Sequence, residues 1–166
     1  MTMDTSAYGG PTASPFQRPE PNLAAALAAG TATALAMAVV WAGITAVTNY
    51  QIGFMAIGVG IAVGFAVRTA GGGSATPFRL AAALLALAGC LGGNLLVACV
   101  VYARAHEVGI ERVLEVLDLQ LSEFLLVQTF TPMDLLFYGL AVWEAWRSAG
   151  TQAEPPPPDA TAAIAR

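Results

Sequence analysis

Between Glu20 and Arg68 the chain contains no Asp, Glu, Lys, Arg or His, and most of this run is apolar. A transmembrane helix needs about 20 mostly apolar residues. The run is therefore long enough for two crossings, with a polar break at residues 49–51. A second uncharged stretch covers residues 80–103. These two stretches predict a protein that is integral to a lipid bilayer.

Composition supports the membrane assignment. Of the 166 residues, 57% are hydrophobic and 11% are charged, which leaves too few polar side chains to coat a soluble domain of this size. The net charge of −4 and the lack of a basic patch argue against nucleic acid as a partner. Residues 1–22 are rich in Gly, Pro, Ser and Thr, and residues 149–166 are Pro-rich. The composition of both segments predicts that they are disordered tails.

Hydrophobic periodicity predicts an all-α membrane protein with four transmembrane helices in one domain, residues 23–148. We place the helices at about residues 23–48, 50–68, 80–104 and 132–147. The start of the last helix is well marked. Thr131 can cap the free amides, Pro132 suits the first helical position, and Asp134 three residues after the cap completes a capping-box pattern.

Residues 107–128 predict an amphipathic helix between the third and fourth crossings. Apolar residues recur at helical spacing on one face, at Ile110, Leu114, Leu117, Leu121 and Leu125. A second face carries Glu111, Glu115, Asp118 and Ser122. We expect the apolar face to cover the mouth of the bundle at the membrane interface and the acidic face to be solvated. A cation site on the acidic face is the alternative.

The distribution of arginines predicts the orientation, because cytoplasmic loops carry an excess of Lys and Arg. With both termini in the cytoplasm, five of the seven basic residues lie inside, namely Arg18, Arg68, Arg79, Arg147 and Arg166. Arg104 and Arg112 then lie outside, among acidic residues. We therefore expect a multi-pass membrane protein with both ends in the cytoplasm.

Glycines punctuate the second and third predicted helices. They stand at Gly53, Gly58, Gly60 and Gly64 in the second helix and at Gly89 and Gly93 in the third. Small residues allow helices to approach closely in lipid. We expect these glycines to pack the second helix on the third within one chain. A homodimer seam or a pore lining is the alternative.

Polar side chains that could carry a function are sparse. The candidates are Asn49, Gln51, Asn94, Asp134 and Glu144. Asn94 is expected to bond a neighbouring helix, with a substrate contact as the alternative. Cys90 and Cys99 lie roughly opposite each other on one helix, so they predict neither a disulfide nor a metal-ligand pair. The sequence predicts no catalytic residue, no cofactor and no metal.

Three motifs stand out in the predicted helices: NYQIGFMAIGVG at residues 49–60, continuing to residue 68, GCLGGNL at residues 89–95, and DLLFYGLA at residues 134–141 with Glu144. Together they resemble a family of small uncharacterised bacterial four-helix membrane proteins. The similarity covers about residues 23–147. It implies the four-helix architecture and a location in the bacterial inner membrane, and it supplies no catalytic residues.

The function that we expect is non-catalytic and acts through protein contacts within the lipid bilayer, with a homo-oligomer or another membrane protein as the partner. A small channel or transporter is the alternative, and it would use the Gly-rich second helix and Asn94.

Overall fold

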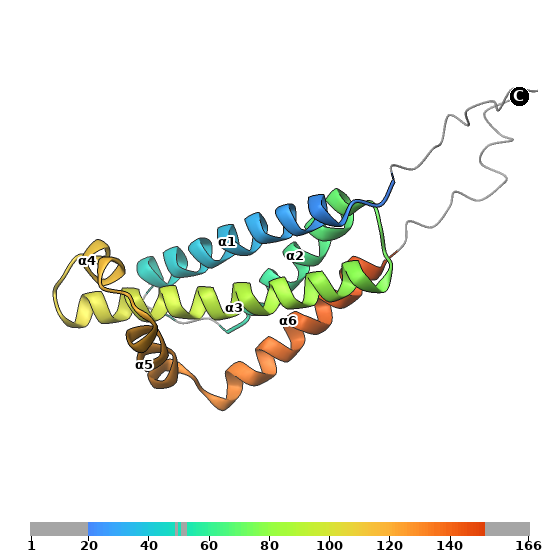
Figure 1. Ribbon diagram of the computed structural model, residues 1–166. Coiled ribbons are helices and arrows are strands. Elements are labelled where there is room, and N and C mark those ends of the chain that lie inside the picture. The colour runs from blue at the N-terminus through green and yellow to red at the C-terminus, as the bar shows by residue number, and fades with distance from the viewer. Residues whose placement is uncertain (1–19, 49, 51–52, 152–166) are drawn as a thin grey trace, which may run out of the picture.

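The computed structural model describes residues 20–48, 50 and 53–151, which contain six helices and no strand (Figure 1). The helices are α1 (Leu23–Thr48), α2 (Met55–Gly71), α3 (Thr76–Ala105), α4 (Ile110–Glu115), α5 (Leu119–Thr129) and α6 (Pro132–Gly150). The all-α class predicted from hydrophobic periodicity is confirmed for this part of the chain.

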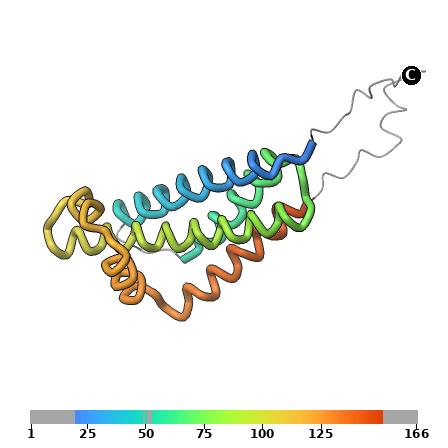
Figure 2. The backbone as a smooth tube through the Cα atoms, viewed as in Figure 1, coloured from blue at the N-terminus to red at the C-terminus, as the bar shows by residue number. Residues whose placement is uncertain are grey.

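Four of the helices, α1, α2, α3 and α6, form an up-and-down bundle (Figure 2). Helices α2 and α3 each contact both α1 and α6, so α1 and α6 lie on opposite sides of the α2–α3 pair. We call the end at which residues 20 and 151 lie the terminal end. There the Arg68 Nη1 donates to the Thr151 carbonyl at 3.3 Å, and the Asn22 N–H donates to the Gly71 carbonyl at 2.8 Å. The opposite end carries α4 and α5 and is called the distal end.

The core of the bundle is built largely from small residues. The buried side chains include thirteen alanines, namely Ala26, Ala34, Ala38, Ala42, Ala56, Ala82, Ala83, Ala86, Ala98, Ala103, Ala141, Ala145 and Ala149. Many of the large apolar side chains face outward instead, as Leu35, Val39 and Leu135 do at 64%, 63% and 64% exposed. Small residues inside and large apolar residues outside are the pattern of a bundle that packs in lipid.

Two helices are long and apolar enough to cross a membrane, α1 with 26 residues and α3 with 30. Helices α5 and α6 pass the same test as a pair but are bent by 103° at the break between them, so the number rises to three if the pair is one span. Helix α2 is apolar but has only 17 residues. The membrane character predicted from the sequence is therefore supported by two to three apolar helices.

The second and third helices differ in their bounds from the prediction. The second was expected at residues 50–68 but begins at Met55 and ends at Gly71, where Gly72 adopts a left-handed conformation with φ 62°. The third was expected to begin at residue 80 but begins at Thr76. The prediction placed its start after the charge of Arg79, whereas Pro77 in the first turn starts the helix.

The predicted tails also start at different residues. Asn22, assigned to the first tail, accepts a hydrogen bond from the Ala25 N–H at 3.0 Å and so caps α1. The last helix was expected to end at residue 147, with a tail from 149, but α6 continues to Gly150 and Ala149 is fully buried. Residues 1–19 and 152–166 of the two predicted tails lie outside the described residues.

The single amphipathic helix predicted at residues 107–128 is wrong, because two short helices replace it. Helix α4 ends at Glu115 and α5 begins at Leu119. Between them, the Asp118 carboxylate accepts a hydrogen bond from the Leu121 N–H at 2.7 Å. Asp118 therefore caps α5, and a cap cannot continue the preceding helix. The sequence analysis had placed Asp118 on a continuous acidic face.

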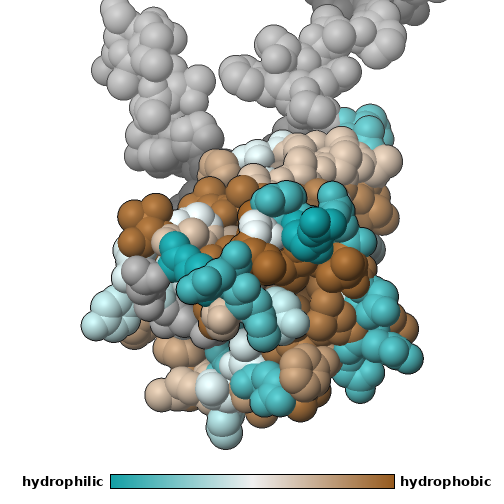
Figure 3. Space-filling view, turned by 90° about the vertical axis from the view of Figure 1, so that its left-hand side faces the viewer, coloured by the Kyte–Doolittle hydropathy of each residue, from teal (hydrophilic) through white to brown (hydrophobic). Residues whose placement is uncertain are grey.

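The break also changes which side chains are buried. Val113 is 2% exposed and Leu125 is 4% exposed, and both pack on the distal part of α3. Leu114, expected in the apolar face, is 43% exposed. Figure 3 looks onto the distal end and shows hydrophilic side chains mixed with hydrophobic ones. The prediction that these apolar residues cover the mouth of the bundle is confirmed for Leu125 and is wrong for Leu114.

Candidate functional site: a buried polar layer near the distal end

Two of the glycines in α2 face α6. A Cβ at Gly60 would meet the backbone of Ala141, and one at Gly64 would lie 2.7 Å from the Ala145 carbonyl oxygen. The sequence reading placed this seam on the third helix, and the structure places it on α6. The partner was missed because the spacing of glycines indicates a face but not the helix that it contacts.

The remaining candidate glycines lie at other contacts. A Cβ at Gly89 would lie 3.0 Å from Val59 Cγ1, so this glycine does join α3 to α2. Gly53 lies against the ring of Phe137, whereas Gly58 has only the Met37 methyl at 3.8 Å from the position of a Cβ.

Gly93 has a distinct neighbour, the indole of Trp41. A Cβ there would lie 2.7 Å from Trp41 Cε3, so the missing side chain lets the ring lie against the α3 backbone. This contact joins α1 to α3 next to Asn94 in the sequence.

The buried polar side chains of the described residues lie toward the distal end. Thr45, Asn94 and Asp134 are 4%, 0% and 8% exposed. Trp41 and Tyr138, which carry one polar atom each, are 1% and 5% exposed. We define Trp41, Thr45, Asn94 and Tyr138 as the polar layer.

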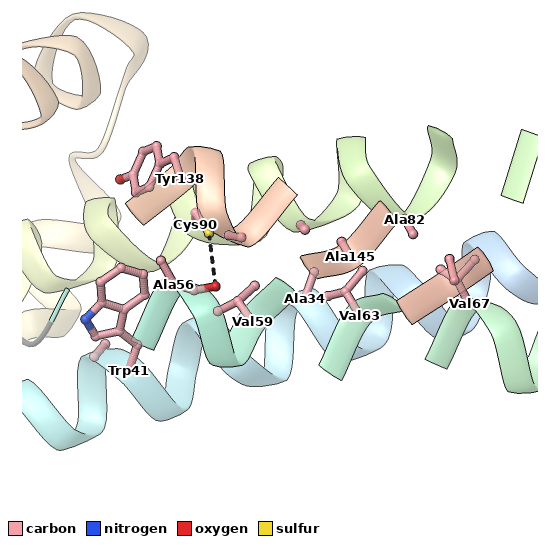
Figure 4. Close-up of a cluster of buried hydrophobic side chains, with 14 of the residues drawn as sticks. Ala34, Trp41, Ala56, Val59, Val63, Val67, Ala82, Cys90, Tyr138 and Ala145 are labelled. Carbon is pink, nitrogen blue, oxygen red and sulfur yellow. Dashed lines mark hydrogen bonds between the residues drawn. The ribbon is translucent and has the colours of Figure 1, made fainter. Parts of the chain in front are cut away.

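The members of the polar layer come from three helices. Trp41 and Thr45 are one turn apart on α1, Asn94 is on α3, and Tyr138 is on α6. Asn94 and Tyr138 stand on two helices that contact each other, and both side chains are buried. In Figure 4, Trp41 and Tyr138 lie on either side of the start of α2, and the indole nitrogen and the hydroxyl both point in the same direction along the bundle. These hydrogen-bonding groups are buried inside a bundle whose core is otherwise apolar.

The Asp134 side chain takes part in the cap at the start of α6. Its Oδ2 accepts hydrogen bonds from the Thr131 N–H at 2.7 Å and from the Thr131 Oγ1 at 2.9 Å. Both residues line an open pocket of about 220 Å³ that Gly53, Met133 and Phe137 complete. The capping pattern predicted for Thr131 and Asp134 is thus present in the structure.

The other polar candidates lie apart from the layer. Glu144 forms a salt bridge with Arg147 at 2.9 Å, near the terminal end of α6. Asn49 and Gln51 lie outside the described residues. Cys90 and Cys99 are free and buried, and the Cys90 thiol is 3.9 Å from the Ala56 carbonyl. Within the described ranges, no three His, Cys, Asp or Glu residues lie close enough together to hold a metal ion.

Sequence reasoning identified Asn94 but missed the other three members of the layer. Tyr138 stands inside one of the motifs that carry the resemblance. Its hydroxyl was missed because tyrosine counts as apolar in a helix pattern. Trp41 and Thr45 stand four residues apart, so they share one face of α1. That spacing is the signal that could have linked them.

No family model matches the chain, and neither a curated protein nor a solved structure matches it.

Proposed function

We propose that this chain is an integral protein of the bacterial inner membrane with four crossings, α1, α2, α3 and α6. The observation that supports it best is the packing, with alanine and glycine at the helix contacts and large apolar side chains on the outside. Helix α2 would span roughly 25 Å and α6 roughly 28 Å at 1.5 Å per residue. Both lengths approach the hydrocarbon thickness of about 30 Å.

The spatial distribution of charge supports an orientation with the terminal end in the cytoplasm. Arg68, Arg79 and Arg147 lie at the terminal end, where Arg79 Nε donates to the Trp146 carbonyl at 3.3 Å. The distal end carries Arg104 and Arg112 together with five acidic residues, Glu107, Glu111, Glu115, Asp118 and Glu123. The positive-inside tendency therefore favours a cytoplasmic terminal end.

Labelling of single cysteines tests the four crossings. Both native cysteines are first replaced by alanine, and one cysteine is then placed at an exposed site in each loop or end: Pro21, Tyr50, Ala75, Glu115 or Thr151. We expect a membrane-impermeant maleimide to label the Tyr50 and Glu115 variants in intact spheroplasts. The other three variants should react only after permeabilisation. Labelling of Tyr50 and Ala75 from the same side would contradict a crossing by α2.

For the biochemical role, we propose a non-catalytic protein that acts through lateral contacts with another membrane protein or a second copy of this chain. An apolar groove of about 110 Å³ between α1 and α3 supports this role. Its walls are mainly small side chains: Thr31, Ala34, Leu35, Ala38, Leu85, Ala88, Gly89 and Gly92. Such a surface allows close approach of a further helix.

Crosslinking in native membranes tests the lateral contact. Ala88→Cys places a thiol in the groove, in the background without native cysteines. We expect oxidation or a short bifunctional maleimide to give a larger adduct, of twice the mass for a homodimer. The matched variant Leu136→Cys, which is exposed on α6, should give less adduct. Equal crosslinking of both variants, or none, would contradict a specific contact at the groove.

A further inference from the structure

The polar layer contains hydrogen-bonding atoms without a partner among the described residues. Trp41 Nε1 and Thr45 Oγ1 are both buried and make no hydrogen bond there. Buried polar atoms are nearly always paired with protein or ordered water. In a bundle surrounded by lipid, bulk water cannot satisfy them from the side, which makes the need for an internal partner greater.

Thr45 lacks a hydrogen bond that three other helical threonines make. Thr48, Thr69 and Thr129 each donate to the carbonyl four residues earlier, at 2.8, 2.9 and 2.8 Å. A buried threonine in a helix has this bond available without any partner from outside. The hydroxyl of Thr45 makes no such bond. It is therefore left to bond with another group inside the layer.

The chemistry of the Trp41 indole limits which hydrogen-bond partner the layer can contain. An indole N–H can only donate, so its partner must offer an acceptor lone pair. A hydroxyl both donates and accepts, and a water molecule held by two to four polar groups satisfies such a mixed set. The layer is also close to the distal surface, because the exposed Arg104 donates to the carbonyl of Ala46, the residue after Thr45.

From these contacts we infer that the polar layer is a water-binding site within the bundle. One or more ordered water molecules accept the hydrogen bond of Trp41 Nε1 and bond to the hydroxyl of Thr45, beside Asn94 and Tyr138. The water enters from the distal end. This site is independent of the lateral contact proposed above, since it lies inside the bundle and the groove lies on its surface.

Magnetic resonance of the indole proton tests the site directly. Trp143→Phe and Trp146→Phe leave Trp41 as the only tryptophan, which is then labelled with ¹⁵N in detergent-solubilised protein. We expect cross-relaxation between the Trp41 indole proton and the water resonance, of the sign given by a long-lived bound water. Thr45→Val should remove most of this signal. The matched control Thr48→Val, on the exposed side of the same helix, should leave it unchanged.

Other outcomes would overturn the inference. The wild-type spectrum tests the site even if Thr45→Val does not fold. A missing water signal at the Trp41 indole proton of the wild type would contradict a bound water. Cross-peaks from the Trp41 indole proton to a side-chain amide, lost in Gln51→Ala or Asn49→Ala, would assign the partner to the chain instead. A water signal of full strength in a folded Thr45→Val would remove that hydroxyl from the site. Thr45→Ser, which keeps the hydroxyl, should retain the signal.

Discussion

Gly60→Ala should destabilise the bundle by about 3 kcal/mol, toward the upper part of the range for overpacking in a filled core. The added Cβ would meet the backbone of Ala141 on α6, and a backbone cannot move aside as a side chain can. Reversible unfolding of the detergent-solubilised protein measures the loss. We expect the free energy of unfolding to fall because α2 and α6 must separate.

Gly139→Ala is the matched control, since it adds the same methyl group to a helix of the same bundle. Among the described residues, no heavy atom of another helix lies within 4 Å of the position of its Cβ. Alanine is a better helix former than glycine by roughly 0.5–1 kcal/mol, so this variant should be unchanged or slightly more stable. Equal losses in the two variants would show that Gly60 is not at the α2–α6 contact.

Leu125→Ala should cost about 2–5 kcal/mol, the usual range for truncating a buried leucine. Leu125 is the most buried residue of α5 and packs with Ala98 and Cys99 of α3. Its truncation leaves a cavity beneath α5, and we expect α5 to loosen from the bundle before global unfolding. Hydrogen exchange of the α5 amides, together with the free energy of unfolding, measures both effects.

Leu119→Ala provides the comparison on the same helix. Leu119 is 85% exposed, so its truncation opens no cavity and should change stability by less than about 0.5 kcal/mol. A loss at Leu119 as large as that at Leu125 would mean that the outer face of α5 is covered. The pair therefore also reports whether α5 has a partner on its outer side.

Local signals in the sequence are sufficient for some of the helix bounds. Helix α1 has the limits predicted for it, residues 23–48, because an uncharged apolar run ends at a polar segment on each side. Helix α6 begins at Pro132 as expected, since Thr131 and Asp134 satisfy the first amides from within four residues. Both cases depend on groups that are close along the chain.

The register at the distal end could not be predicted in the same way. Ile110 to Leu125 follow one helical period, and the period continues through the break at Asp118. The capping bond of Asp118 and the packing of Val113 on α3 compete with a continuous helix. Hydrophobic periodicity reflects only the helical preference of the segment itself. It carries no information about how the segment packs on α3.

The sequence by itself determined that the chain is helical and apolar enough for a membrane, because hydropathy and capping act over one or two turns. Only the tertiary structure decided that Gly60 faces α6 and that Trp41, Thr45, Asn94 and Tyr138 are all buried. Gly60 and its neighbour Ala141 are 81 positions apart along the chain, and Trp41 and its neighbour Gly93 are 52 positions apart. Which of them meet depends on how whole helices pack against one another, and small side chains permit close approach without specifying the partner.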